Sequence, residues 1–303
     1  MIGLPALYTF AGLVFAAYAL LSLKRLRFGN AAFWALVALS FLAGDLLGDF
    51  GNGLLVLALV ALAGLGVLRK PDVVDSAEDG ARYGNRLFLP ALIIPITALA
   101  GTFLLADSGL IDPKQVTLVS LGLGVIFALI ALYIWLRPPP MAALEEGRRL
   151  IDAVGWAAVL PQMLASLGAV FAVAGVGDLV GGAASQVIPS SSLFAAVAAY
   201  AIGMALFTII MGNAFAAFPV MTAAIGLPLL ITGFGGNPAI VCAIGMLAGF
   251  CGTLMTPMAA NFNIVPAALL ELKDRNAVVK VQVGTALPLL AVNIALIYLL
   301  AFR

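Results

Sequence analysis

The chain has 303 residues, of which 64% are hydrophobic and 10% charged, and its formal net charge at pH 7 is +1. Soluble domains carry about 25% charged residues, so the composition excludes a soluble domain of useful size and predicts a polytopic membrane protein. A charge so close to zero gives no reason to expect nucleic acid as a partner, and the lipid bilayer is the expected environment.

Cysteine and histidine usage argues against metal and redox chemistry. Cys242 and Cys251 are the only cysteines, and at ~100° per residue they would point to roughly opposite faces of a helix, so no disulfide is expected. The sequence contains no histidine, so no His/Cys metal cluster can form, and we expect neither a metal site nor a cofactor.

The first half of the chain contains five apolar segments that we expect to span the membrane. The opening stretch MIGLPALYTF lacks the basic region of a signal peptide, so its segment is expected to remain as a span. The five segments cover residues 3–23, 31–48, 53–68, 87–106 and 116–136.

Two hydrophilic loops, 69–86 and 137–152, separate these spans and carry charges of both signs. We expect both loops to be solvated faces. Catalytic carboxylate pairs are the sharper interpretation, but nothing in the sequence holds these loops against a pocket. The acidic residues concerned are Asp75, Glu78, Asp79, Glu145 and Glu146.

The second half adds spans at 153–176, 193–211 and 282–302, with a region from 212 to 272 that is broken by Gly, Pro and Asn. We therefore divide the chain into a scaffold-like part, 1–152, and a part that resembles a transport site, 153–303. The whole is expected to be an all-α membrane protein with about nine to ten membrane segments.

Two apolar stretches inside the broken region, 219–232 and 239–251, are short. At 1.5 Å per residue each covers only ~20 Å, less than the ~30 Å hydrocarbon core. Joined by GFGGNP, they are typical of a re-entrant hairpin, although two tilted full crossings would have the same parity.

Lysine and arginine predict the orientation, because cytoplasmic loops carry an excess of both. Of the 15 basic residues, 13 fall in alternate loops, leaving Lys114 and Arg303 on the other side. Both termini are therefore expected outside the cytoplasm.

The stretch CGTLMTPMAANFNIVP (251–266) concentrates polar residues and prolines in this apolar region. Each unpaired polar group in hydrocarbon costs several kcal/mol, so such a break persists only when it is buried in protein or lines a cavity. Interrupted segments of this kind indicate a transporter's binding site. Close packing of helices explains the small residues equally well, but it requires no amides such as Asn213, Asn261 and Asn263.

Several long motifs resemble one family. The stretches 203–230 (GMALFTIIMGNAFAAFPVMTAAIGLPLL) and 245–272 (GMLAGFCGTLMTPMAANFNIVPAALLEL) are similar to bacterial inner-membrane proteins of domain-of-unknown-function family 979. Residues 84–95 and 155–177 extend the similarity over most of the chain.

The resemblance implies a companion membrane subunit from family 969 and a role of the pair in uptake of 5-oxoproline. A weaker kinship with the elevator carriers of the ion-transporter superfamily implies that this chain supplies one repeat and its companion the other. The resemblance carries over no binding residue by position.

Physical reasoning supplies candidate residues instead. A small carboxylate with a lactam ring needs a positive field, which helix N-termini provide, together with amide donors and acceptors. Sodium would be coordinated by hydroxyls and by carbonyls freed near proline, and it is favoured over protons because the motif contains no acid. The expected substrate-binding residues are Asn213, Thr253, Thr256, Asn261 and Asn263, and the expected ion-binding residues are Thr253, Thr256, Pro257 and Asn261.

Two other functions are an intramembrane enzyme and a structural or assembly subunit. An intramembrane enzyme is disfavoured because the chain lacks histidine and a Gly-x-Ser-x-Gly elbow, while Ser190–Ser192 lie in a loop with no base nearby. A structural or assembly subunit, whose polar breaks only contact a partner, remains an alternative that substrate binding would distinguish.

Overall fold

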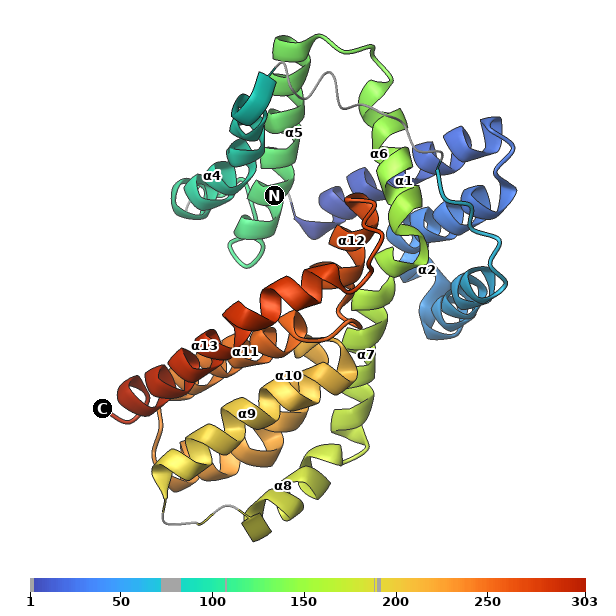
Figure 1. Cartoon of the computed structure of the whole chain (residues 1–303). Helices are drawn as coiled ribbons and strands as arrows, with labels where there is room; N and C mark the ends of the chain where they lie inside the picture. The colour runs from blue at the N-terminus through green and yellow to red at the C-terminus, as the bar shows by residue number, and fades with distance from the viewer. Residues whose placement is uncertain (1–2, 72–82, 107, 188, 190–191) are drawn as a thin grey trace. The chain divides into compact units, whose positions relative to one another are not determined.

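The computed structural model describes residues 3–71, 83–106, 108–187, 189 and 192–303 (Figure 1). Every regular element in these ranges is a helix, as predicted. Seven helices are long and apolar enough to cross a membrane, and one further pair, bent by 70°, passes the same test as a unit. The chain divides into two compact units, Met1–Gly155 and Trp156–Arg303.

The first unit begins with α1 (Leu4–Lys24) and α2 (Phe28–Gly64), and α2 is folded back on itself. Gly48 has a φ of +62°, which only glycine adopts without strain. Asn30, near the start of α2, donates to the carbonyl of Arg69 beyond its end at 2.9 Å and accepts from the Arg69 N–H at the same distance. The two halves of α2 are therefore antiparallel, and they provide the two spans expected at 31–48 and 53–68.

A second helical hairpin follows in the first unit. In this hairpin α4 and α5 pack closely, since a Cβ at Gly124 would lie 2.9 Å from the carbonyl oxygen of Ile94. The remaining elements of the unit are η1 (Gly84–Leu87), α4 (Phe88–Leu104), α5 (Val116–Leu136) and the amphipathic α6 (Ala142–Val154).

The second unit holds the region that the sequence marks as broken. Its elements are η2 (Gly155–Ala158), α7 (Leu160–Val173), α8 (Val176–Val187), α9 (Leu193–Met211), α10 (Ala214–Met221), η3 (Thr222–Gly233), α11 (Pro238–Leu254), η4 (Ala260–Ile264), α12 (Val265–Leu269) and α13 (Ala277–Leu300). Its core consists mainly of side chains from α9, α10, η3, α11 and the end of α13.

Four of these segments form a bundle whose directions follow from their contacts. Tyr200 of α9 lies 3.3 Å from the Thr222 hydroxyl, and Gly203 faces Met221, so the segment from α10 through η3 runs antiparallel to α9. In α11, Gly245 faces Tyr200 of α9 and Gly252 faces Thr208 further along α9, so the two helices run parallel. Finally, α13 runs antiparallel to α11, because the Asn237 N–H donates to the Ala301 carbonyl at 2.7 Å.

These helices are longer than the apolar stretches from which a hairpin was inferred. Residues Ala214–Gly233 form a continuous span of 20 residues, and α11 has 17. Pro228 does not end the segment, because the backbone widens into the π-helix η3, in which the Phe234 N–H reaches the Leu229 carbonyl at 2.9 Å. At 1.5 Å per residue α11 covers only ~25 Å, less than the ~30 Å hydrocarbon core, so these lengths are compatible with both interpretations, a re-entrant hairpin and two tilted crossings.

One helix, α8, lies where a loop was expected. The chain bends by 70° after α7, and α8 then packs on η3 through glycines. A Cβ at Gly181 would lie 2.8 Å from the Ala224 carbonyl oxygen, and one at Gly168 of α7 would lie 2.6 Å from Cα of Ala216. Helix α8 escaped prediction because glycines, which have a low helix propensity, lie on the face that packs on η3, as Gly177 and Gly181 do.

Candidate functional site

Two interruptions of helices meet inside the second unit. The first separates α9 from α10 at Gly212, and the second separates α11 from η4 at residues 255–259. The Thr256 hydroxyl donates to the Ile209 carbonyl at 2.9 Å, which ties the second break to the last turn of α9. Gly212 has a φ of +75°, and a Cβ there would lie 2.9 Å from the Met258 carbonyl oxygen. Glycine at 212 therefore allows the two breaks to touch.

Three of the expected site residues are buried at the second break. Thr253, Thr256 and Asn263 have 2%, 1% and 1% of their surface exposed. The Thr253 hydroxyl donates to the Phe250 carbonyl at 2.6 Å, and the Asn263 amide donates to the carbonyls of Thr253 and Thr256 at 2.9 and 2.6 Å. The Thr253 carbonyl lies in the last turn of α11, where helix ends leave carbonyls without a helical N–H, and the Asn263 amide supplies its donor.

The other expected residues have different positions. Asn213 is 8% exposed and begins α10, where its Oδ1 accepts from the Phe215 N–H at 2.8 Å. Its amide therefore serves as an N-cap, a role that the spacing of the sequence did not predict. Pro257 is exposed in the turn between α11 and η4, and Asn261 lies on η4 with its side chain outside the described part.

The depth of the breaks follows from α13. The Asn293 amide donates to Cys251 Sγ at 3.5 Å, so the last turn of α11 lies beside Asn293. At 1.5 Å per residue, Asn293 is ~20 Å along α13 from Lys280, the last charged residue before its apolar stretch. Helix α11 continues only to Leu254, so its break lies alongside the apolar part of α13 and well inside the level of Lys280.

Charge is almost absent around these breaks. From residue 156 to residue 270 the sequence contains no lysine or arginine and a single acid, Asp178, which is exposed in the first turn of α8. The field at the breaks therefore comes from helix ends: the N-terminus of α10 is positive, and the C-termini of α9 and α11 are negative.

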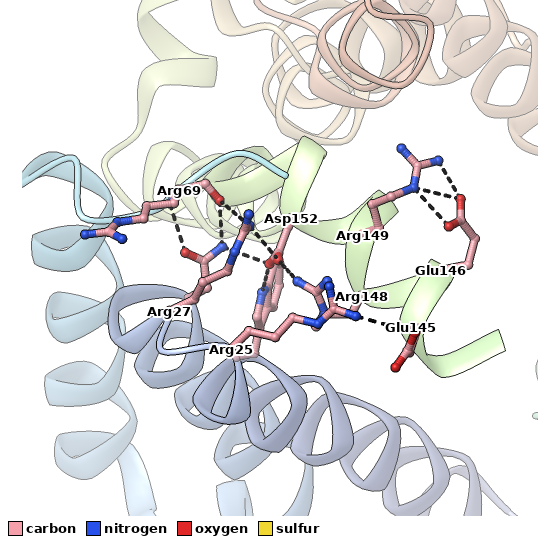
Figure 2. Close-up of polar contacts among 10 residues, drawn as sticks. Arg25, Arg27, Arg69, Glu145, Glu146, Arg148, Arg149 and Asp152 are labelled. Atoms are coloured by element: carbon pink, nitrogen blue, oxygen red, sulfur yellow. Dashed lines mark hydrogen bonds and ion pairs between the residues drawn. The ribbon is translucent and has the colours of Figure 1, made fainter. Parts of the chain in front are cut away.

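The first unit contains a second polar cluster, which the sequence analysis missed. Figure 2 shows the guanidinium groups of Arg27 and Arg148 lying on the Asp152 carboxylate, with N–O distances of 3.6 and 2.6 Å. Asn30 and Trp34 donate to the other carboxylate oxygen at 2.9 and 2.7 Å. Four side chains thus converge on one carboxylate.

This cluster corrects the expectation that loop 137–152 is a solvated face. Arg148 and Asp152 are 3% and 2% exposed, because α6 is amphipathic and turns them toward α1 and α2. Glu145 and Glu146 are exposed as expected, and the hydrogen bond from Arg149 lowers the pKa of the Glu146 carboxyl. Asp75, Glu78 and Asp79 lie outside the described residues.

The serine loop gives no nucleophile in its described portion. Ser192 Oγ accepts from the Ala195 N–H at 3.3 Å, which makes it the N-cap of α9. Ser190 and Ser191 lie outside the described residues.

Comparison with known proteins places the chain in one family. A model of the family described as "Protein of unknown function (DUF979)" matches residues 5–302, nearly the whole chain. No curated protein matches. No solved structure matches either.

Proposed function

We propose that this chain, which belongs to the DUF979 family, is one subunit of a two-component secondary transporter that takes up a small carboxylate. One observation carries the proposal: two helix breaks from distant parts of the sequence touch inside an apolar bundle, at Thr256–Ile209 and Gly212–Met258. Non-helical backbone at such depth is tolerated where it lines a cavity or is buried in protein, and transporters build substrate and ion sites there.

The substrate that we propose is 5-oxoproline. The N-terminus of α10 would attract its carboxylate without a full charge, in a region that has no basic side chain. Asn213 and Asn261 would offer amide groups to the lactam, and the resemblance to family 979 supports the choice of ligand.

The partner that we propose is the companion subunit of family 969. The described residues contain one such pair of touching breaks, and in this proposal the chain would supply one half of the repeat pair on which elevator carriers are built, with the companion supplying the other. In this proposal the protein lies in the bacterial inner membrane with both termini outside the cytoplasm, supported by the alternation of basic loops.

Transport by purified components tests the function. Proteoliposomes containing this chain, its companion, or both are assayed for uptake of labelled 5-oxoproline, with proline, which lacks the ring carbonyl, as the competitor control. We expect uptake only with both subunits and weak competition by proline. Full transport by this chain alone would contradict the shared site, and inactivity of the folded pair would contradict the function.

A structural or assembly subunit is the second candidate, and one observation favours it. The hydroxyl and amide hydrogens of Thr253, Thr256 and Asn263 are already used within the break. Asn261→Ala separates the two candidates. If the breaks only support assembly, this change lowers the amount of complex but leaves 5-oxoproline binding per folded complex unaltered. A substrate site would instead lose affinity at normal abundance.

A further inference from the structure

The orientation of the Asn263 amide is determined by its neighbours. Its nitrogen lies 2.9 Å from the Thr253 carbonyl oxygen and 2.6 Å from the Thr256 carbonyl oxygen. If the amide were flipped, its oxygen would face two other oxygens with no hydrogen between them. Both N–H groups are therefore committed to these carbonyls, and Oδ1 points elsewhere.

That oxygen has no hydrogen-bond partner among the described residues. Asn263 is 1% exposed, and its Oδ1 is buried without a hydrogen bond. A buried acceptor left unmatched is costly, and native structures seldom keep one without a role. The Thr253 and Thr256 hydroxyls do not supply a hydrogen to it, since they already donate to the carbonyls of Phe250 and Ile209.

The oxygens of Thr253, Thr256 and Asn263 can therefore still accept, whereas the hydroxyl and amide hydrogens of these three side chains are already donated to carbonyls. Neutral hydroxyl, amide and carbonyl oxygens suit a hard monovalent cation, whereas a divalent ion usually requires carboxylates. Asp178 is the single acid between residues 156 and 270, and it lies on the exposed side of α8. A group of three or more Cys, Asp or Glu side chains that could hold a metal ion does not occur among the described residues.

We propose that Asn263 Oδ1 is a ligand of a sodium ion at the break between α11 and η4. This assigns Asn263 to the ion, whereas the sequence placed it with the substrate. The alternative donor, the lactam N–H of the substrate, is disfavoured because the negative C-terminus of α11 would repel the substrate's carboxylate. The inference rests on the proposed transport function only in calling the ion a coupling ion.

Cation-dependent stability of the purified full-length chain tests the site without transport. Melting temperatures are measured in NaCl, KCl and choline chloride at equal ionic strength. We expect Na⁺ to raise the melting temperature in a saturable manner, with no rise in choline. Identical melting curves in the three salts would overturn the proposal. It would also be overturned if 5-oxoproline raised the melting temperature in choline chloride while Na⁺ neither produced nor enhanced such a rise.

Variants locate the ion. Asn263→Ala should remove the sodium effect or require at least about tenfold more Na⁺, the consequence of losing one buried ligand. Ser120→Ala is the matched control, because the Ser120 hydroxyl is also buried without a hydrogen bond but lies on α5, in the first unit. It should keep the sodium response, and so should Asp178→Asn. Loss of the response in Asp178→Asn with retention in Asn263→Ala would move the ion to α8.

The two proposals fail separately. If Na⁺ stabilises the chain but the pair never transports 5-oxoproline, the ion site stands and the proposed function falls. If the pair transports equally well in choline and Na⁺ has no effect on melting, the function stands and the ion site is wrong. If Asn263→Ala does not fold, the comparison of salts on the unaltered chain decides the outcome.

Discussion

At the scale of single residues, glycine is essential where two backbones meet. Gly212 has a left-handed backbone and also lies against Met258. Each of these two features by itself disfavours a side chain at position 212. The left-handed region alone costs a residue with a side chain roughly 1–2 kcal/mol. A Cβ at 2.9 Å from a carbonyl oxygen adds overlap that only a shift of the second break could relieve.

Gly212→Ala should therefore lower the free energy of unfolding by at least about 2 kcal/mol. Gly284→Ala is the control, because a Cβ at this helical position meets nothing within 4 Å, and the change should be neutral or mildly stabilising. Thermal melting of both variants in detergent measures the difference. Equal melting temperatures would mean that the two breaks do not touch.

The Asp152 carboxylate is another position where one atom group decides stability. It lies between the guanidinium groups of Arg27 and Arg148 and has no exposed side-chain surface. Removing its charge leaves two cations beside a neutral group in a buried setting, which costs about 3–5 kcal/mol when one partner of a buried pair is lost.

We expect Asp152→Asn to reduce the amount of folded protein sharply, whereas Glu145→Gln should have little effect. The Glu145 pair with Arg25 is half exposed at 3.4 Å, and such pairs contribute up to about 1 kcal/mol. Fluorescence-detected size-exclusion chromatography of the two variants provides the comparison. A normal Asp152→Asn profile would show that the cluster is dispensable.

At the scale of helices, the sequence predicted the positions of the membrane spans better than the exact bounds of the individual helices. Most of the spans in both halves were predicted within a few residues, because apolar length is a strong signal. The break after α11 was also evident, since Pro257 and two asparagines interrupt an apolar run. Helix α8 was missed, and α10 was placed too late, because small residues and internal prolines conceal helices that tertiary contacts maintain.

Partners of the site residues could not be predicted. The Thr256 hydroxyl donates to a carbonyl 47 residues away in the sequence. The Asn263 amide donates both of its hydrogens to carbonyls, and this depends on the path of the backbone through the break. The residue types predicted a polar site, but only the folded chain determines which of their atoms remain available to a ligand. For the same reason Asp152 resembled a solvated acid until α6 was seen against α1 and α2.

At the scale of the whole molecule, the expected orientation can be tested at two exposed positions. Glu146 lies on α6, and Leu110 lies between α4 and α5, with 63% of its surface exposed. In sealed cells, a cysteine at 146 should react with a membrane-impermeant maleimide only after permeabilisation, and one at 110 should react directly. The parent chain, with Cys242 and Cys251 alone, is the background control, and the reversed pattern would invert the topology.

The Asp152 cluster also determines the order in which the helices of the first unit can assemble during synthesis. Trp34 and Asp152, which bond at 2.7 Å, are separated by 118 residues of chain. At roughly 5–20 residues per second, about 6–24 seconds pass between synthesis of the tryptophan and synthesis of its acceptor. The hairpins formed by α2 and by α4 with α5 can insert during that interval, but the amphipathic α6 can dock only afterwards. The first unit is thus completed by its last helix, and a ribosome that stalls before residue 152 leaves Asn30 and Trp34 of α2 without the carboxylate to which they donate.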